Sequence, residues 1–322
     1  MDKNTDIPLS GQVESWQEKA RKTADRIRFR VLEHTLRQNG GYMSQACSSA
    51  ELFATLYLRI MKLGPSAAPM LPPPFSGTPG KNNPNYTTGH LYNGLPGLDL
   101  DRFIFSPSHY ALVLYATLIE VGRMAPDGLL HFNQDGSTME MIGAEHSPGV
   151  EVTGGSLAQA LSQAAGIAYA RKRRGDTGRV FVLLSDGELQ EGQTWETFQV
   201  ISHYRLDNLL IYVDVNGQCC DGLMANVLNI EPIAPRLEAF GMRTFQVNAH
   251  DVDALVGPAE QPPDGRPTVV LCYSNPTQGL DLLKTRAPKL HYLRFRDEAE
   301  RQLYSVELDR WAERLKESEQ EK

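Results

Sequence analysis

The chain has 322 residues, of which 41% are hydrophobic and 22% charged, a composition typical of one large α/β domain or two small ones. Its net charge of -7 and pI near 5.7, with no basic stripe, disfavour a nucleic-acid-binding protein. No apolar run reaches the ~18 residues that a membrane helix needs, and the first residues, MDKNTDIPLSGQ, lack the pattern of a signal peptide, so we expect a soluble cytoplasmic protein.

Two helices are predicted near the N-terminus. Residues 11–38 carry apolar side chains at helical spacing, and the sequence Asn39-Gly40-Gly41 ends this helix. Residues 48–60 predict a second helix with Ser48 as its N-cap, because a glutamate follows three residues later. The next segment, 64–98, is dense in Pro, Gly and Asn and is predicted to be a long surface loop.

Apolar strands then alternate with helices over most of the chain. Short apolar runs predict strands at 102–106, 179–185, 208–215, 243–248 and 267–273. Helical spacing predicts helices at 109–124, 157–174, 191–204, 231–240, 251–257 and 296–321. This alternation predicts an α/β fold, a doubly wound parallel sheet with helices on both faces. We expect one domain over residues 1–322, made up of the sheet, an N-terminal helical segment (11–63), the loop (64–98) and a C-terminal helical extension (290–322).

Two other features have ordinary interpretations. The basic run RKRRG at 171–175 follows an apolar helix, so it is interpreted as the last turn of that helix, with phosphate binding as the alternative. The four cysteines contain no CxxC pair and are predicted to be reduced thiols: Cys47, Cys219, Cys220 and Cys272.

Two predicted strands end on oxygen-bearing side chains about thirty residues apart. The segment RVFVLLSDGELQE carries Asp186, and NLLIYVDVNGQCCDG carries Asn216. Because ligands collect at the carboxyl ends of parallel strands, these two groups and the Gln218 carbonyl suit Mg²⁺ or Ca²⁺ bridging to a diphosphate. Gly187 would let a backbone N–H approach a phosphate oxygen. Taken singly, Asp186 is also a helix cap and Asn216 a turn former.

Four motifs resemble those of transketolases. SDGELQEGQTWE, followed by DNLLIYVDVNG, resembles the family's thiamine-diphosphate motif, in which GDG precedes an Asn by about thirty residues. PGVEVTGGSLAQA resembles its PGVE turn, DRFIFSPSHYALVLYA its DRFVLS-x-GHA element, and KLHYLRF its KWHG. The motifs occur in the family's order between about residue 25 and residue 300. The resemblance therefore implies the thiamine-diphosphate-binding fold for nearly the whole chain.

The resemblance also implies roles for individual residues. Asp186, Asn216 and the Gln218 carbonyl would hold the metal. The cofactor would contact these two side chains and His109, Gly155, Ser156, Leu157, Gly187, Glu188 and His291. His109 and His291 would be catalytic, since imidazoles exchange protons near neutral pH, and a shifted alignment brings His146 near the donor hydroxyls. Glu191 and Glu196 match glutamates at the family's subunit contact.

Some positions depart from the family pattern. Ser185 replaces the first glycine of GDG, and Tyr42 stands where the family has a histidine. LGQG has become LAQA at 157–160, and PTQG at 276–279 lacks the lysines of KGKG. The cofactor residues are thus retained while sugar-facing residues differ, which favours an unusual sugar.

The length of the chain implies a partner. Transketolases have three domains, and this chain accounts only for the first. We therefore expect the N-terminal subunit of a split transketolase, transferring a two-carbon ketol unit from a ketose to an aldose in an α₂β₂ assembly with a C-terminal transketolase subunit. Two alternatives remain open: the α subunit of a 2-oxo acid dehydrogenase, and a non-catalytic regulatory paralogue.

Overall fold

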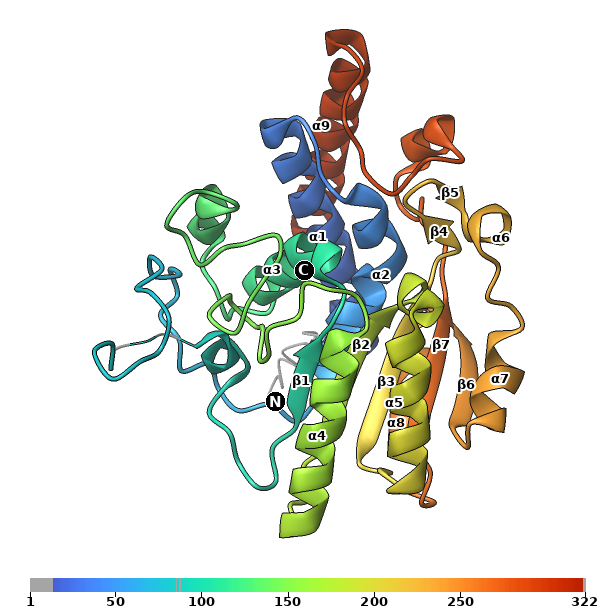
Figure 1. Cartoon of the computed structure of the whole chain (residues 1–322). Coiled ribbons are helices and arrows are strands. Elements are labelled where there is room, and N and C mark those ends of the chain that lie inside the picture. Colours follow the sequence, from blue (N-terminus) through green and yellow to red (C-terminus); the bar gives the residue numbers. More distant parts are fainter. Residues whose placement is uncertain (1–13, 85, 87, 321–322) are drawn as a thin grey trace, which may run out of the picture.

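The computed structural model describes residues 14–84, 86 and 88–320, and its centre is a parallel sheet (Figure 1). The strand order is β1-β2-β3-β7-β6, and every pairing in this sheet is parallel. These strands are β1 (Arg102–Phe105), β2 (Val180–Ser185), β3 (Leu209–Val215), β6 (Arg243–Asn248) and β7 (Thr268–Tyr273). They agree with the predicted strands to within one residue at each end, and the doubly wound α/β fold is confirmed.

Successive side chains of the strands enter two separate apolar cores. Phe181 and Leu183 of β2 pack on one face against α1 (Trp16–Gln38), α2 (Met43–Thr55), α3 (Ala111–Glu120) and α8 (Val252–Glu260). Val182 and Leu184 pack on the other face against α4 (Gln159–Arg174), α5 (Gly192–His203) and α7 (Ile233–Ala239). Because helices cover both faces (Figure 1), the central strands are apolar along most of their length instead of alternating with polar residues.

The second helix begins earlier than the sequence predicts. α2 starts at Met43 and passes at Thr55 into a π-helical turn, Leu56–Ile60. Ser48 therefore lies inside the helix, and its prediction as the N-cap is wrong. Its hydroxyl donates instead to the Gln45 carbonyl (3.2 Å) and to the buried Asp214 carboxylate. The first turn of α2 carries the buried polar residues Ser44 and Gln45, which interrupt the apolar pattern and hide the helix start.

The remaining elements surround the sheet. Residues 11–13 of the predicted first helix, residues 85 and 87 of the loop and the last two residues of the C-terminal extension lie outside the described residues. α9 (Glu298–Gln320) lies against α1, where the Arg301 guanidinium donates to the Leu36 carbonyl (3.1 Å; Figure 1). Shorter elements are β4 (Gln218–Cys219), β5 (Gly222–Leu223), α6 (Met224–Val227) and the 3-10 turns Gly89–Asn93, Ser108–Tyr110, Pro126–His131, Asp186–Gln190 and Asp281–Arg286.

Three other predictions concern local chemistry. Arg171 to Arg174 form the last turn of α4, and Gly175 follows in the left-handed conformation, as predicted for a helix end. The four cysteines are unpaired in the described part of the chain. None of the helices described there combines the length and apolarity needed to cross a bilayer.

Candidate cofactor and metal site

A cavity of about 400 Å³ lies at the carboxyl ends of β2 and β3. Residues that the sequence singled out, from six separate segments of the chain, line this cavity. They are Tyr42, His109, Gly155, Leu157, Asp186, Gly187, Glu191, Asn216, Gln218 and His291. The structure thus brings together the two strand ends, the glycine-rich turn and two of the three predicted catalytic histidines.

Asp186 follows the last residue of β2 and is only 1% exposed. Its Oδ2 accepts a hydrogen bond from the Gly217 N–H at 2.8 Å. Burial, and then the nearby charge of Asp214, raise the pKa of Asp186 to about 8. A bound cation would offset both effects, because an adjacent positive charge favours the carboxylate. The side-chain Oε1 of Gln218 is also buried without a hydrogen-bond partner among the described residues. This oxygen-rich set therefore fits a hard divalent metal.

Asn216 is oriented by Asp214, a residue that the sequence analysis missed. The Asn216 amide nitrogen donates to Asp214 Oδ2 (3.2 Å) and to the Tyr110 hydroxyl (2.9 Å). Tyr110 in turn donates to the same Asp214 oxygen (2.7 Å), while the other oxygen accepts from Ser274. Burial raises the pKa of Asp214, and these donors oppose that shift. The signal for Asp214 was its spacing, since residues two apart on a strand share a face.

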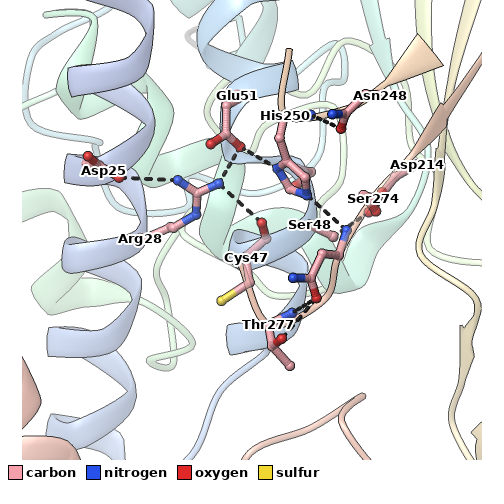
Figure 2. A network of polar contacts seen from close by, with 12 residues as sticks. Asp25, Arg28, Cys47, Ser48, Glu51, Asp214, Asn248, His250, Ser274 and Thr277 are labelled. Carbon is pink, nitrogen blue, oxygen red and sulfur yellow. Dashed lines mark hydrogen bonds and ion pairs between the residues drawn. The ribbon is translucent and has the colours of Figure 1, made fainter. Parts of the chain in front are cut away.

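A polar network extends from Asp214 and Ser274 to Arg28 on α1 (Figure 2). Past Ser274, the Asn275 N–H donates to Nε2 of His250 (2.9 Å), so the ring proton lies on Nδ1, 3.1 Å from the Glu51 carboxylate. Glu51 also pairs with Arg28, which is 2% exposed. The network therefore ties α1 and α2 to the segment that follows β7.

The two histidines of the cavity lie together. The rings of His109 and His291 have centroids 5.1 Å apart, and the Tyr42 ring is 5.8 Å and 5.5 Å from them. Burial, with a smaller effect of His291, lowers the pKa of His109 to about 3, and burial also lowers the pKa of His291. Gln45 Nε2 lies 3.4 Å from Nδ1 of His291, an arrangement in which Nδ1 accepts and Nε2 carries the proton. Both rings are thus neutral, able to accept or donate a proton.

Glu188 and Ser185 form a buried support behind the cavity. Their side chains make a capping box at the turn after β2, with the Ser185 N–H donating to Glu188 Oε2 (2.8 Å). Glu188 Oε1 accepts from the Ala158 N–H (3.0 Å) and from Ser106. The serine in place of the family's glycine thus has a structural use. The carboxylate of Glu188 is occupied by protein donors instead of facing the cavity.

Three predicted residues lie elsewhere. His146 Nε2 is 3.1 Å from the Glu140 carboxylate, and its ring lies against Phe75, outside the cavity lining. Ser156 is exposed on the glycine-rich turn, next to Leu157, and does not line the cavity. Glu196 is exposed and lines a separate groove between α4 and α5.

Comparison with known proteins gives one consistent family. Residues 95–279 match the family described as "Transketolase, thiamine diphosphate binding domain". A protein of Sinorhizobium fredii named "Putative uncharacterized transketolase family protein y4mO" is 35% identical over 295 residues, which cover 89% of this chain and 92% of that protein. One subunit of the apulose-4-phosphate transketolase of Actinobacillus succinogenes is 29% identical over 255 residues, which cover 79% of this chain and 82% of that protein.

Longer proteins share only part of their length with this chain. Transketolase from Leishmania mexicana superposes with a TM-score of 0.65 at 22% identity, covering 96% of this chain and 47% of that one. At this level of identity, the similarity shows that the two proteins share a fold. Among the curated relatives, the chain also spans only 33% to 37% of several longer proteins.

Proposed function

This chain belongs to the transketolase family, and from that premise we propose that it is the cofactor-binding subunit of a two-chain transketolase-like enzyme. The enzyme transfers a two-carbon ketol unit from a ketose to an aldose, and residues 1–322 form its single thiamine-diphosphate- and metal-binding domain. The observation that carries this proposal is the cavity at the strand ends, where Asp186 and Asn216 share one lining with His109 and His291.

The lengths of the relatives support a partner chain. This chain covers most of the Actinobacillus apulose-4-phosphate transketolase subunit, whereas it covers only about half of the Leishmania transketolase. In the proposed assembly, a C-terminal transketolase subunit supplies the remaining domains and completes the site between the chains as α₂β₂. The exposed side chains of Glu191 and Glu196 are placed at that contact.

Individual residues then take specific tasks. Asp186, Asn216 and the Gln218 carbonyl hold Mg²⁺ or Ca²⁺, and the Gly187 N–H approaches the diphosphate. Gly155 and Leu157, which line the cavity, would contact the pyrimidine of the cofactor. Thiamine diphosphate supplies the carbon–carbon chemistry when bound. The neutral rings of His109 and His291 accept or donate protons at the substrate hydroxyls.

Cofactor binding tests the first half of the proposal. The chain co-purified with its proposed C-terminal partner subunit is titrated with thiamine diphosphate and Mg²⁺ by calorimetry. We expect saturable, Mg²⁺-dependent binding that is lost in Asp186→Asn and kept in Asp309→Asn, which changes an exposed aspartate of α9 in the same way. No binding by the wild-type complex would favour a non-catalytic, regulatory protein.

Activity tests the second half. The complex is assayed for ketol transfer from D-fructose 6-phosphate and D-fructose to an aldose, and for decarboxylation of pyruvate. We expect ketol transfer by the complex and none by the isolated chain. Turnover by the chain alone would contradict the need for a partner. Decarboxylation of pyruvate without ketol transfer from either sugar would favour a 2-oxo acid dehydrogenase subunit.

A further inference from the structure

Gln45 is a buried polar side chain in the wall of the cofactor cavity. It lies in the first turn of α2, is 1% exposed and lines the cavity together with His291. The two residues are 246 positions apart in the chain. Gly41 and Leu293 exchange two backbone hydrogen bonds of 2.9 Å, which hold the segment of His291 against the residues that precede α2. The contact between Gln45 and His291 therefore belongs to the packed site and not to a local turn.

The carboxamide of Gln45 has a defined orientation. Its Nε2 donates to the backbone carbonyl of His291 (3.2 Å), and because a carbonyl oxygen can only accept, the nitrogen end of the amide must face His291. The oxygen end, Oε1, accepts from the Ser44 hydroxyl (3.0 Å). The partners at both ends thus assign the amide and exclude the flipped orientation.

This orientation fixes the tautomer of His291. Nε2 of Gln45 carries a second N–H and lies 3.4 Å from Nδ1 of the ring, so Nδ1 accepts. Burial lowers the pKa of His291 and so favours the neutral ring, in which the single proton then lies on Nε2. Nε2 has no hydrogen-bond partner among the described residues, and the residue lines the cavity. Its N–H is therefore left for a bound group.

His109 is not restrained in this way. Its ring centroid lies 5.1 Å from that of His291, but neither of its ring nitrogens has a hydrogen-bond partner in the part of the chain that the structure describes. A neutral imidazole without a fixed tautomer can present an N–H or an unprotonated nitrogen at a given position. The restriction to one role thus falls on His291 alone.

We propose that Gln45 is a positioning residue that commits His291 to donate a hydrogen bond from Nε2 to a substrate oxygen. The inference rests on the proposed function, which places the substrate in this cavity. It gives the two histidines different tasks. His291 stabilises negative charge on an oxygen through its N–H, and it does not accept a proton at that nitrogen.

Nitrogen NMR of the full chain tests the tautomer without cofactor or turnover. In protein labelled with ¹⁵N-histidine, the ring signals of His291 are those missing from His291→Asn. We expect one protonated and one unprotonated nitrogen at pH 7, with the couplings to the ring C–H protons identifying Nε2 as the protonated one. A proton on Nδ1 would overturn the proposal.

Gln45→Met removes both amide donors and keeps a side chain of similar length. Because a hydrogen bond to the neutral ring is lost, part of the population should move its proton to Nδ1, and the pKa of His291 should rise. Gln302→Met, on the exposed face of α9, is the matched control and should change neither signal. The other titratable groups that contact the ring or share its cavity stay the same in all three proteins: Tyr42, His109, Asp186, Glu191 and Asp221. Identical His291 signals in Gln45→Met and wild type would overturn the role of Gln45.

Kinetics of the complex with its proposed partner subunit test the use of this N–H. Ketol transfer from D-fructose 6-phosphate to an aldose is measured from pH 8 to pH 5. Near pH 8 we expect Gln45→Met to lower kcat about three- to tenfold with little change in KM, because the donor is misplaced in part of the molecules. The deficit should narrow as pH falls through the pKa measured by NMR, since the imidazolium carries a proton on both nitrogens.

The outcomes separate this inference from the proposed function. A kcat deficit that is equal at every pH would indicate a merely structural role for Gln45, and an unchanged kcat would show that the N–H is not used. Both results would overturn the inference and leave the transketolase activity standing. Absence of ketol transfer by the wild-type complex would overturn the activity and the inference together.

Discussion

The amide nitrogen of Asn216 donates to Oδ2 of Asp214 across 3.2 Å, and this contact decides which end of the Asn216 carboxamide is oxygen. Asp214→Asn removes the negative charge and replaces one of the two acceptor oxygens by a donor, which allows the carboxamide of Asn216 to turn. Because residues that orient metal ligands typically change metal affinity by 10–100-fold, we expect Mg²⁺-dependent binding of thiamine diphosphate to weaken by about that factor. Calorimetry on the complex measures it.

Tyr110→Phe is the matched control for this prediction. It removes one hydroxyl but leaves the Asp214–Asn216 contact in place. Its effect on the dissociation constant should be smaller than that of Asp214→Asn. Equal cofactor affinity in Asp214→Asn and wild type would show that Asp214 does not orient the metal ligand.

Ala158 is held in a strained backbone conformation, with φ of 71°, and its N–H is bonded to Glu188. The left-handed region costs a non-glycine residue ~1–2 kcal/mol, whereas glycine loses ~0.4–1 kcal/mol of chain entropy on folding. We expect Ala158→Gly to raise the free energy of unfolding by about 0.5 kcal/mol. Ala164→Gly, the same change in the middle of α4, should lower it by about 1 kcal/mol. Urea denaturation distinguishes the two, and destabilisation by both would argue against strain at Ala158.

The buried pair of Glu51 and Arg28 should contribute strongly to stability. Burial would raise the pKa of Glu51, but His250 and Arg28 outweigh it and hold the pKa below its usual value. Glu51→Gln removes the buried carboxylate that contacts Arg28 and leaves the guanidinium with the more exposed Asp25, 3.3 Å away, so we expect a loss of about 3 kcal/mol of unfolding free energy. Glu33→Gln, on the exposed face of α1, should change it little. A loss below 1 kcal/mol in Glu51→Gln would contradict an ionised pair.

His34 should make stability fall in weak acid. Its pKa is about 4 in the folded chain and near 6.5 when unfolded, so between these values the unfolded state binds the extra proton. The stabilising contribution is therefore complete above pH 6.5 and is lost as pH falls toward 4, by about 3 kcal/mol. The difference between wild type and His34→Phe, measured by urea denaturation from pH 7 to pH 4, reports this contribution. His131→Asn, at an exposed position, is the control, and a pH-independent difference would contradict the assignment.

The features that could be predicted from the sequence are those that depend on neighbouring residues in the chain. Strand positions such as 180–185 follow from apolar runs, and the strand ends at Asp186 and Asn216 follow from where those runs stop. The motif resemblance placed His109 and His291 in one cavity, as the structure does. Each of these features depends on a short, contiguous segment of the sequence.

Features that depend on distant partners were not predicted. Ser48 appeared to be a helix cap because its true partner, Asp214, is 166 residues away. Glu188 was predicted to contact the cofactor because it lies in the SDGE motif. Its carboxylate instead accepts hydrogen bonds from Ser106 and from the Ala158 N–H, which lie outside that motif. Both ring nitrogens of His34 are buried without a hydrogen-bond partner among the described residues, which only the packed chain can reveal.

The contact between Gln45 and His291 joins residues 246 positions apart, and it closes a long loop at the cofactor cavity. On a ribosome, the strand ends that carry Asp186 and Asn216 emerge well before this histidine. A nascent chain can therefore bring Asp186 and Asn216 together first, but it lacks the imidazole and the Gly41–Leu293 bridge until residue 293 has been made. Long loops are also slow to close, because chain entropy must be lost before the contact forms. We therefore expect the cofactor cavity to be complete only late in the synthesis of the chain.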